Sequence, residues 1–142
     1  MTGSLAVIDA SLALKLVLPN PLRNVCRVLI TRLISEGVEL VAPALWAYET
    51  TSTLCKAVRF GQLTADEARS VLVQLTELNV RLVSPDDAQN RHAFEWTVQL
   101  NRAAAYDSYY LALAEALGCE FWTADHRLFE AVDLSWVHWV GG

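Results

Sequence analysis

The sequence predicts an α/β protein, a three-layer α/β/α sandwich around a mainly parallel central sheet of about five strands. Short apolar runs rich in β-branched residues alternate along the chain with longer segments of helical composition, the order that a parallel sheet with crossover helices requires. The 142 residues contain no internal repeat, low-complexity tract or linker. Residues 1–142 are therefore expected to form one domain, long enough to bury a hydrophobic core.

Proline and glycine mark the predicted helix starts and ends in the first half of the chain. Pro19 closes a first helix, and Asn20-Pro21 is typical of a cap followed by a proline in the first helical position. Gly37 ends that second helix, Pro43 opens a third, and Gly61 ends it. The predicted elements here are strand Leu5–Asp9, helix Ala10–Leu18, a helix from Asn20 to about Glu36, strand Val38–Ala42 and helix Pro43–Phe60.

Capping signals organise the second half. Thr64 and Glu67 have the spacing of a capping box, Ser84-Pro85-Asp86-Asp87 begins the following helix, and Gly118 stops the last long one. The predicted elements are a helix from Thr64 to about Leu78, strand Val80–Val83, a helix from Ser84 to about Leu100, helix Ala103–Leu117, strand Cys119–Thr123, helix His126–Ala131 and strand Trp136–Val140.

Composition narrows the functional classes. The net charge of −5 argues against an ordinary basic nucleic-acid-binding surface, although carboxylates that hold divalent metals can still present positive charge to phosphate. The apolar window Leu5–Leu18 is too short to span a membrane and carries Asp9 and Lys15, and there is no secretory signal. We therefore expect a cytoplasmic protein with no membrane contact.

Cysteine and tryptophan add two expectations. Cys26, Cys55 and Cys119 are odd in number and set in apolar surroundings, which predicts reduced cysteines in the core rather than disulfides or a zinc site. The 54% hydrophobic content and five tryptophans exceed what one small core covers, which favours a homo-oligomer or an obligate partner.

Four acidic residues stand in unusual surroundings. Asp9, Glu49, Asp107 and Asp125 are each a lone acid in an apolar neighbourhood, with no basic residue at helical salt-bridge spacing. Burial of an unpaired carboxylate is costly, so groups distant in sequence must satisfy them. The other twelve acids lie in first helical turns, at element ends or on polar faces, where we expect solvated surface residues.

Topology brings the four acids together. Asp9 ends the first strand, Asp125 follows the fourth, and Glu49 lies in the second turn of the helix that leaves the second strand. Asp107 is near the amino end of a helix that returns to the fourth strand, and this end also lies at the carboxyl edge of the sheet. Ligands of open α/β sheets bind outside that edge, so the four carboxylates are expected to converge on one cleft.

Such a cluster requires cations. Oxygen ligands without histidine or cysteine select Mg²⁺ or Mn²⁺, and such ions activate water and stabilise the oxygens of a phosphodiester displacement. We therefore predict that all four acids are both metal ligands and catalytic residues.

The motifs around these acids resemble the PIN-domain family, specifically its VapC-type toxin ribonucleases, over essentially the full length. Val7-Ile8-Asp9-Ala10-Ser11 is similar to the family's opening, and Pro43 with Glu49 matches its proline-led helix. Tyr106-Asp107-Ser108, followed by an apolar helix, Gly118 and Thr123-Ala124-Asp125, resembles its most recognisable segment.

The resemblance implies a Mg²⁺- or Mn²⁺-dependent endoribonuclease that is the toxin of a VapBC-type toxin–antitoxin pair. It also implies a homodimer blocked by a cognate VapB-type antitoxin, from a bacterial or archaeal source. Where some relatives carry a further acid, this sequence has Arg127, which either contacts phosphate or is a surface arginine.

Several supporting roles stay open. Ser11 and Thr123 either orient a metal-bound water or serve as a helix cap and a strand-end hydroxyl. Tyr106 and Tyr109 either stack on a base or belong to the core, the interpretation that the sequence favours. His126 and His138 are interpreted as structural.

Three other classes of protein compete with a nuclease. A catalytically inactive PIN-fold interaction module is opposed by the four intact acids. An aspartate-based phosphatase normally has a second aspartate where Ser11 stands, and a phospho-acceptor receiver domain would need a lysine at the end of a late strand.

Overall fold

A computed structural model describes residues 4–102 and 104–142. Its strands form a five-stranded sheet in the order β3-β2-β1-β4-β5, and every pairing is parallel. The sheet confirms the predicted fold class. The strands are β1 (Leu5–Ile8), β2 (Glu39–Pro43), β3 (Arg81–Val83), β4 (Glu120–Thr123) and β5 (Val137–Trp139).

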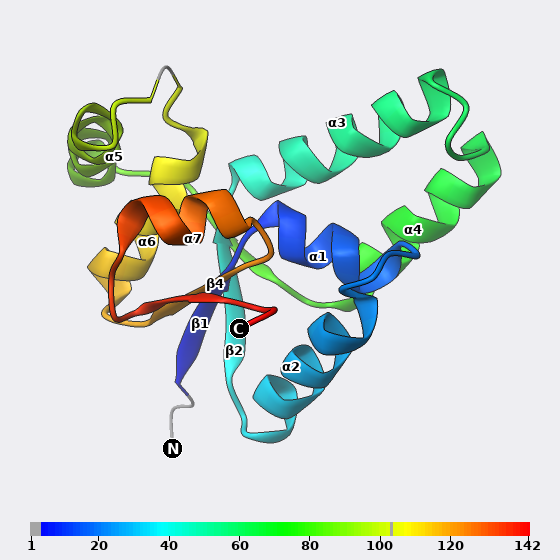
Figure 1. The fold of residues 1–142 in the computed structure, drawn as a ribbon, viewed down its shortest axis with the longest axis horizontal. Coiled ribbons are helices and arrows are strands. Elements are labelled where there is room, and N and C mark those ends of the chain that lie inside the picture. Colours follow the sequence, from blue (N-terminus) through cyan, green and yellow to red (C-terminus); the bar gives the residue numbers. More distant parts are fainter. Residues whose placement is uncertain (1–3, 103) are drawn as a thin grey trace.

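Helices cover both faces of the sheet (Figure 1). Right-handed crossovers place α1–α4 on one face, because the chain moves outward from β1 to β3, and α5–α7 on the other, because it then crosses to β4 and β5. The helices are α1 (Ala10–Val17), α2 (Arg23–Ser35), α3 (Leu45–Arg59), α4 (Ala65–Glu77), α5 (Asp87–Gln99), α6 (Tyr106–Leu117) and α7 (His126–Val132).

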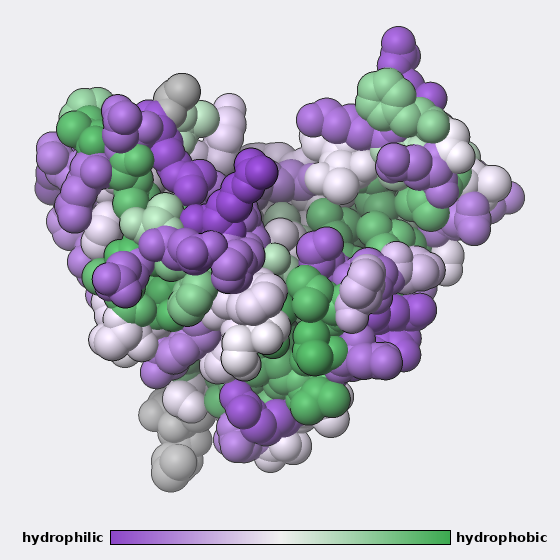
Figure 2. Space-filling model, viewed as in Figure 1, coloured by the Kyte–Doolittle hydropathy of each residue, from purple (hydrophilic) through white to green (hydrophobic). Residues whose placement is uncertain are grey.

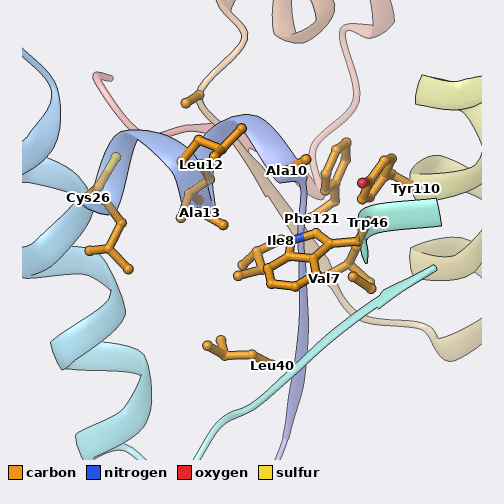
Figure 3. Packing of buried hydrophobic residues seen from close by; sticks show 14 of the residues in the cluster. Val7, Ile8, Ala10, Leu12, Ala13, Cys26, Leu40, Trp46, Tyr110 and Phe121 are labelled. Atoms are coloured by element: carbon orange, nitrogen blue, oxygen red, sulfur yellow. The ribbon is translucent and has the colours of Figure 1, made fainter. Parts of the chain in front are cut away.

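The core lies on both sides of the central strand β1. Val7 and Ile8 are fully buried, as expected for a parallel strand covered on both faces. Tyr110 of α6 stacks on Phe121 of β4 with ring centroids 5.9 Å apart, and Figure 3 shows the two rings side by side. Because β1 and α6 are fixed by this packing, the residues at their ends have defined positions.

Helix ends follow the predicted stops more closely than the predicted starts. Gly118 caps α6 in the left-handed conformation, with φ at 62°, and Thr64 and Glu67 form the complete capping box. The predicted starts at Pro21 and Pro43 were wrong. Pro21 lies in a turn before α2, where the Asn20 side chain accepts from the Leu22 N–H, and Pro43 is the last residue of β2.

Two further boundaries differ from expectation. The helix predicted over Ala103–Leu117 begins at Tyr106, and Ala103 lies outside the described residues. Asp9 belongs to no strand, because it is the N-cap of α1.

The expectations for cysteine and tryptophan were only partly correct. All three cysteines are free, but Cys55 is exposed, and only Cys26 is fully buried. No tryptophan is among the large exposed apolar residues, which are instead found at positions such as Val28, Phe60 and Phe94. Within the residues that the structure describes, no helix is both long and apolar enough to cross a membrane.

Candidate active site

Asp9 lies at the junction of β1 and α1 and is 5% exposed. Its Oδ1 accepts from the Ser11 hydroxyl at 2.7 Å and from the Leu12 backbone N–H at 2.9 Å, while Oδ2 accepts from the Thr123 hydroxyl. Three donors thus hold a buried carboxylate that pairs with no basic residue in the described part of the chain. The buried acid is satisfied by groups up to 114 residues away in sequence.

Thr123 and Ser11 link Asp9 to the end of β4. The Thr123 hydroxyl accepts from the Asp125 N–H at 2.9 Å, and the Ser11 hydroxyl accepts from the Ala124 N–H at 3.3 Å. Asp125 is the N-cap of α7, and its Oδ1 accepts from the Leu128 N–H at 3.2 Å. The N-cap of α1 is Asp9 and not Ser11, which rules out one of the two roles considered for Ser11. The hydroxyls of Ser11 and Thr123 instead position Asp9 and the loop before Asp125.

Glu49 projects from the second turn of α3. Its Oε1 accepts from the Tyr110 phenol at 2.7 Å, and this phenol belongs to a side chain that is 1% exposed. The packing of Tyr110 against Phe121 therefore fixes the position of Glu49 relative to α6.

Asp107 lies in the first turn of α6. Its Oδ2 accepts from Arg102 Nη1 at 3.2 Å, and the Arg102 and Asp107 side chains are 31% and 37% exposed. This is the one ion pair that any of the four acids makes among the described residues.

The electrostatics join the four acids into one cluster. Burial is the main cause that raises the pKa of Asp9 to about 6, in spite of its three hydrogen bonds, and the Asp107 charge adds to it. Burial also raises the pKa of Glu49; the hydrogen bond from Tyr110 lowers it and the Asp107 charge raises it. Burial likewise raises the pKa of Asp107; the Arg102 charge lowers it and the Asp125 charge raises it. The charges of the cluster thus act on one another.

Three hollows meet at Glu49. One of about 350 Å³ contains Glu49, Arg102 and Asp107, a second of about 450 Å³ lies along α3, and a third of about 470 Å³ lies between α1 and α3. Figure 2 shows the molecule hollowed between α3 and the side that bears α5–α7, with hydrophilic residues along the left wall. A cavity of about 620 Å³ at the opposite edge of the sheet contains none of the four acids.

The donor set fits a hard divalent cation by chemistry. The Asp9 carboxylate is buried, the pKa values of Asp9, Glu49 and Asp107 are raised, and the described residues offer these acids one cationic partner, Arg102. Added positive charge is favourable under these conditions. The set is not preassembled, since no three His, Cys, Asp or Glu side chains among the described residues lie close enough together to hold an ion. Side chains would therefore have to turn for a metal to bind, and Arg102 would compete with it for the Asp107 carboxylate.

The other charged residues named in the sequence analysis lie outside the acidic cluster. All twelve other acids are exposed. Arg127 is exposed on α7 and has no ion pair among the described residues. His126 and His138 contact Glu130 and Glu120 rather than the cluster.

Sequence reasoning missed two residues of the site and misjudged a third. Tyr110 lies three residues after Asp107 on α6, a helical spacing that could have suggested a contact near the acids. Arg102 lies in the loop before α6, where no periodic pattern identifies a partner. Tyr106, expected in the core, is 64% exposed.

The parallel sheet with acidic residues at its carboxyl edge places this chain among the α/β proteins that have an acidic site at that edge. Residues 6–134 match the model of the PIN domain. The chain belongs to the PIN-domain family.

Individual relatives agree with this assignment. The chain is 33% identical over 125 residues to Ribonuclease VapC3 of Pyrobaculum aerophilum, a match that covers 87% of this chain and 92% of the relative. It shares its fold with VapBC2 from Rickettsia felis, solved bound to a promoter DNA fragment (TM-score 0.71, 9% identity, 95% and 98% of the two chains). The Sarcin-Ricin loop cleaving toxin VapC20 of Mycobacterium tuberculosis is also similar (TM-score 0.65, 15% identity, 91% and 96%).

Proposed function

We propose that this protein is a metal-dependent endoribonuclease, the toxin of a VapBC-type pair, which acts in the cytoplasm and hydrolyses RNA phosphodiester bonds. The observation that carries the proposal is the grouping of Asp9, Glu49, Asp107 and Asp125 at one sheet edge, each with its own supporting contact. The similarity to a protein named as a ribonuclease supports the choice of RNA.

The chain's own residues divide the work. Asp9, Glu49, Asp107 and Asp125 would hold Mg²⁺ or Mn²⁺, which when bound lowers the pKa of a water and neutralises phosphate charge. Ser11 and Thr123 act as positioning residues, because their hydroxyls orient the Asp9 carboxylate. Tyr110 positions Glu49 in the same way.

Arg102 and Arg127 are two arginines that lie next to the acids in space or in sequence. Arg102 shares a hollow with Glu49 and Asp107, and Arg127 follows Asp125 by two residues. Either guanidinium can bind a phosphate oxygen once it is free of carboxylate.

The test is cleavage of single-stranded RNA with Mn²⁺ and with EDTA. Asp107→Asn should abolish the metal-dependent cleavage, and Asp87→Asn is the matched control, because Asp87 is an exposed acid in the first turn of α5. Retained cleavage in the Asp107→Asn protein, or equal cleavage in EDTA, would contradict the proposal.

We also propose that a small VapB-type antitoxin blocks this site. An apolar segment of the partner would lie in the hollow between α1 and α3, which Leu14, Leu18 and Pro19 line, and an arginine or lysine would reach Glu49 at its end. The structures of relatives solved as VapBC complexes support a partner of this kind. A complex that leaves the ribonuclease fully active would rule the idea out.

A homodimer completes the proposed assembly. Exposed apolar side chains such as Val28, Phe94 and Val98 remain uncovered in the single chain and fit an interface. Sedimentation of the purified protein tests it, and a monomer at micromolar concentration would refute it.

A further inference from the structure

Two exposed tyrosines border the acidic cluster. Tyr48 on α3 is 71% exposed and Tyr106 on α6 is 64% exposed. Each directly precedes a cluster acid, Glu49 in the first case and Asp107 in the second. A single exposed aromatic residue needs no explanation, but two on different elements, both beside the acids, indicate a shared role.

Both tyrosines line the same hollow. The hollow of about 450 Å³ is lined by Leu45, Tyr48, Glu49, Ser52, Thr53, Lys56 and Tyr106. It joins the smaller hollow that contains Asp107 through the shared residues Glu49 and Tyr106. A ligand here would therefore continue directly into the candidate active site.

The walls of this hollow favour a nucleotide over an apolar protein segment. Ser52 and Thr53 contribute hydroxyls, and Leu45 is the one aliphatic side chain among the lining residues. Lys56 is exposed and makes no ion pair among the described residues. Aromatic faces with a free cation beside them are the combination that single-stranded nucleic acid binds.

Spacing along α3 places these groups in register. Tyr48, Ser52 and Lys56 recur every four residues, so they form one row on the helix surface. Lys56 follows Glu49 by seven residues, about 10 Å along the helix axis. The cation is thus well separated from the acids and suits a phosphate beyond the one being cleaved.

We infer that Tyr48, Tyr106 and Lys56 form a subsite for an unpaired nucleotide of single-stranded RNA, with the tyrosine rings stacking on the base and Lys56 contacting the phosphate. This subsite rests on the proposed function, and it deepens that function by assigning the residues that would bind a nucleotide beside the cleavage position. Paired RNA is excluded, because stacked bases do not offer their faces.

The test measures the binding of a fluorescently labelled single-stranded RNA in Mn²⁺ by anisotropy, in the Asp125→Asn background to prevent cleavage. Tyr48→Ala and Tyr106→Ala should each weaken binding about tenfold, whereas Tyr48→Phe and Tyr106→Phe should retain it, since the ring carries the stacking. Phe60→Ala is the matched control, because Phe60 is an equally exposed aromatic residue (72%) at the far end of α3; its binding should be unchanged.

Salt dependence separates stacking from charge. Lys56→Ala should reduce the slope of log affinity against log salt by about 0.7, the value for one contact to a single-stranded phosphate. The tyrosine variants should leave the slope unchanged. The same RNA annealed into a duplex should bind equally weakly to the parent and to the alanine variants.

The outcomes distinguish this inference from the proposed function. If the parent chain cleaves RNA but Tyr48→Ala and Tyr106→Ala bind it like the unsubstituted background, the subsite is refuted and the nuclease stands. The subsite is likewise refuted if these variants keep RNA affinity but lose the antitoxin or the dimer, since the tyrosines then serve a protein interface. If the protein neither binds nor cleaves RNA, both fail, and tyrosine-dependent binding without cleavage supports the subsite alone.

Discussion

At the residue scale, the four acids of the cluster are held in four different ways. Asp9 depends on hydroxyl and backbone donors, Asp125 on a helix N-terminus, Glu49 on a buried phenol and Asp107 on a guanidinium. Only Asp107 has a cationic partner among the described residues, so only there does a protein group compete directly with a metal ion. Arg102 therefore supplies, at Asp107, part of the positive charge that the proposed metal ion would bring.

Arg102→Ala is expected to strengthen Mn²⁺ binding about fivefold in the absence of RNA. Arg102 would compete with a metal ion for the Asp107 carboxylate, and a half-buried pair that solvent still screens is worth about 1 kcal/mol. Isothermal titration calorimetry measures the effect. Arg91→Ala, an exposed arginine of α5 with no ion pair among the described residues, is the control, and weaker Mn²⁺ binding by the Arg102 variant would contradict this competition.

Tyr110→Phe tests the positioning of Glu49. Loss of the phenol removes a hydrogen bond that lowers the pKa of Glu49, so this pKa should rise further and the acidic limb of the cleavage profile should move to higher pH. Stability should fall by about 1 kcal/mol. Tyr109→Phe is the matched control, because the Tyr109 phenol donates to Asn90 at 2.7 Å outside the cluster; equal shifts in both variants would show that Tyr110 has no special role.

The positions of the four acids near one edge of the sheet were easier to predict from the sequence than their hydrogen-bond and ion-pair partners. The sequence alone identifies a lone carboxylate in an apolar run as unusual, because burial of a carboxylate without a partner is costly. The phenol of Tyr110 and the guanidinium of Arg102 have no such mark, since tyrosine and arginine are ordinary both in the core and at the surface. Tyr106 was placed in the core because tyrosine is common there, but it lies in the first turn of α6 and is 64% exposed.

At the element scale, two helices begin at the site. Asp9 caps α1 and Asp125 caps α7, so in each case a backbone N–H of the first turn donates to a cluster carboxylate. The positive ends of these helices partly offset the crowded negative charge. One side chain thus serves both the helix start and the cluster.

This double use predicts different results for two substitutions at one position. Asp125→Asn should abolish cleavage with little loss of stability, because asparagine caps a helix as well as aspartate does. Asp125→Ala should abolish cleavage and also lose about 1 kcal/mol of stability. Thermal melts in EDTA measure the difference, and equal stability of the two variants would argue that the cap contributes nothing.

Element boundaries show what periodicity can and cannot supply. Helix ends at glycine were predicted well, because the left-handed conformation is costly for other residues. The starts near Pro21 and Pro43 failed, because proline fits a turn or the last position of a strand as well as the first turn of a helix. The order of strands and helices survived these errors, since it depends on patterns several residues long.

At the scale of the whole molecule, the fold places carboxylates near one another at one edge of the sheet, where burial disfavours their charged forms. Asp9, Glu49 and Asp107 all have raised pKa values, for which burial is the first cause. The folded metal-free protein therefore binds more protons than the unfolded chain between about pH 4 and pH 6. Ionisation of these acids as pH rises therefore lowers the stability of the metal-free protein.

Metal-free stability should accordingly fall as pH rises from about 4 to 7. The pKa of Asp9 rises from 3.8 to about 6 on folding, so the stabilisation is complete below 3.8 and is lost through pH 6, a loss of order ~3 kcal/mol. Urea unfolding in EDTA at a series of pH values measures it. Constant or rising stability over this range would mean that burial and mutual repulsion do not disfavour the charged carboxylates.

The same repulsion predicts how metal and substitution act together. At pH 7 in EDTA, Asp107→Asn should melt at or above the parent temperature, because it removes one repelling charge at nearly constant shape, although it also gives up the pair with Arg102. Mn²⁺ at a hundredfold excess over its dissociation constant should stabilise the parent by about 2.7 kcal/mol, a rise of about 5–10 °C for a domain of this size. The rise should be much smaller for Asp107→Asn and unchanged for Asp87→Asn, whose exposed carboxylate lies outside the cluster. If Asp107→Asn melts well below the parent in EDTA and all three proteins respond equally to Mn²⁺, Asp107 supports the fold and does not bind metal.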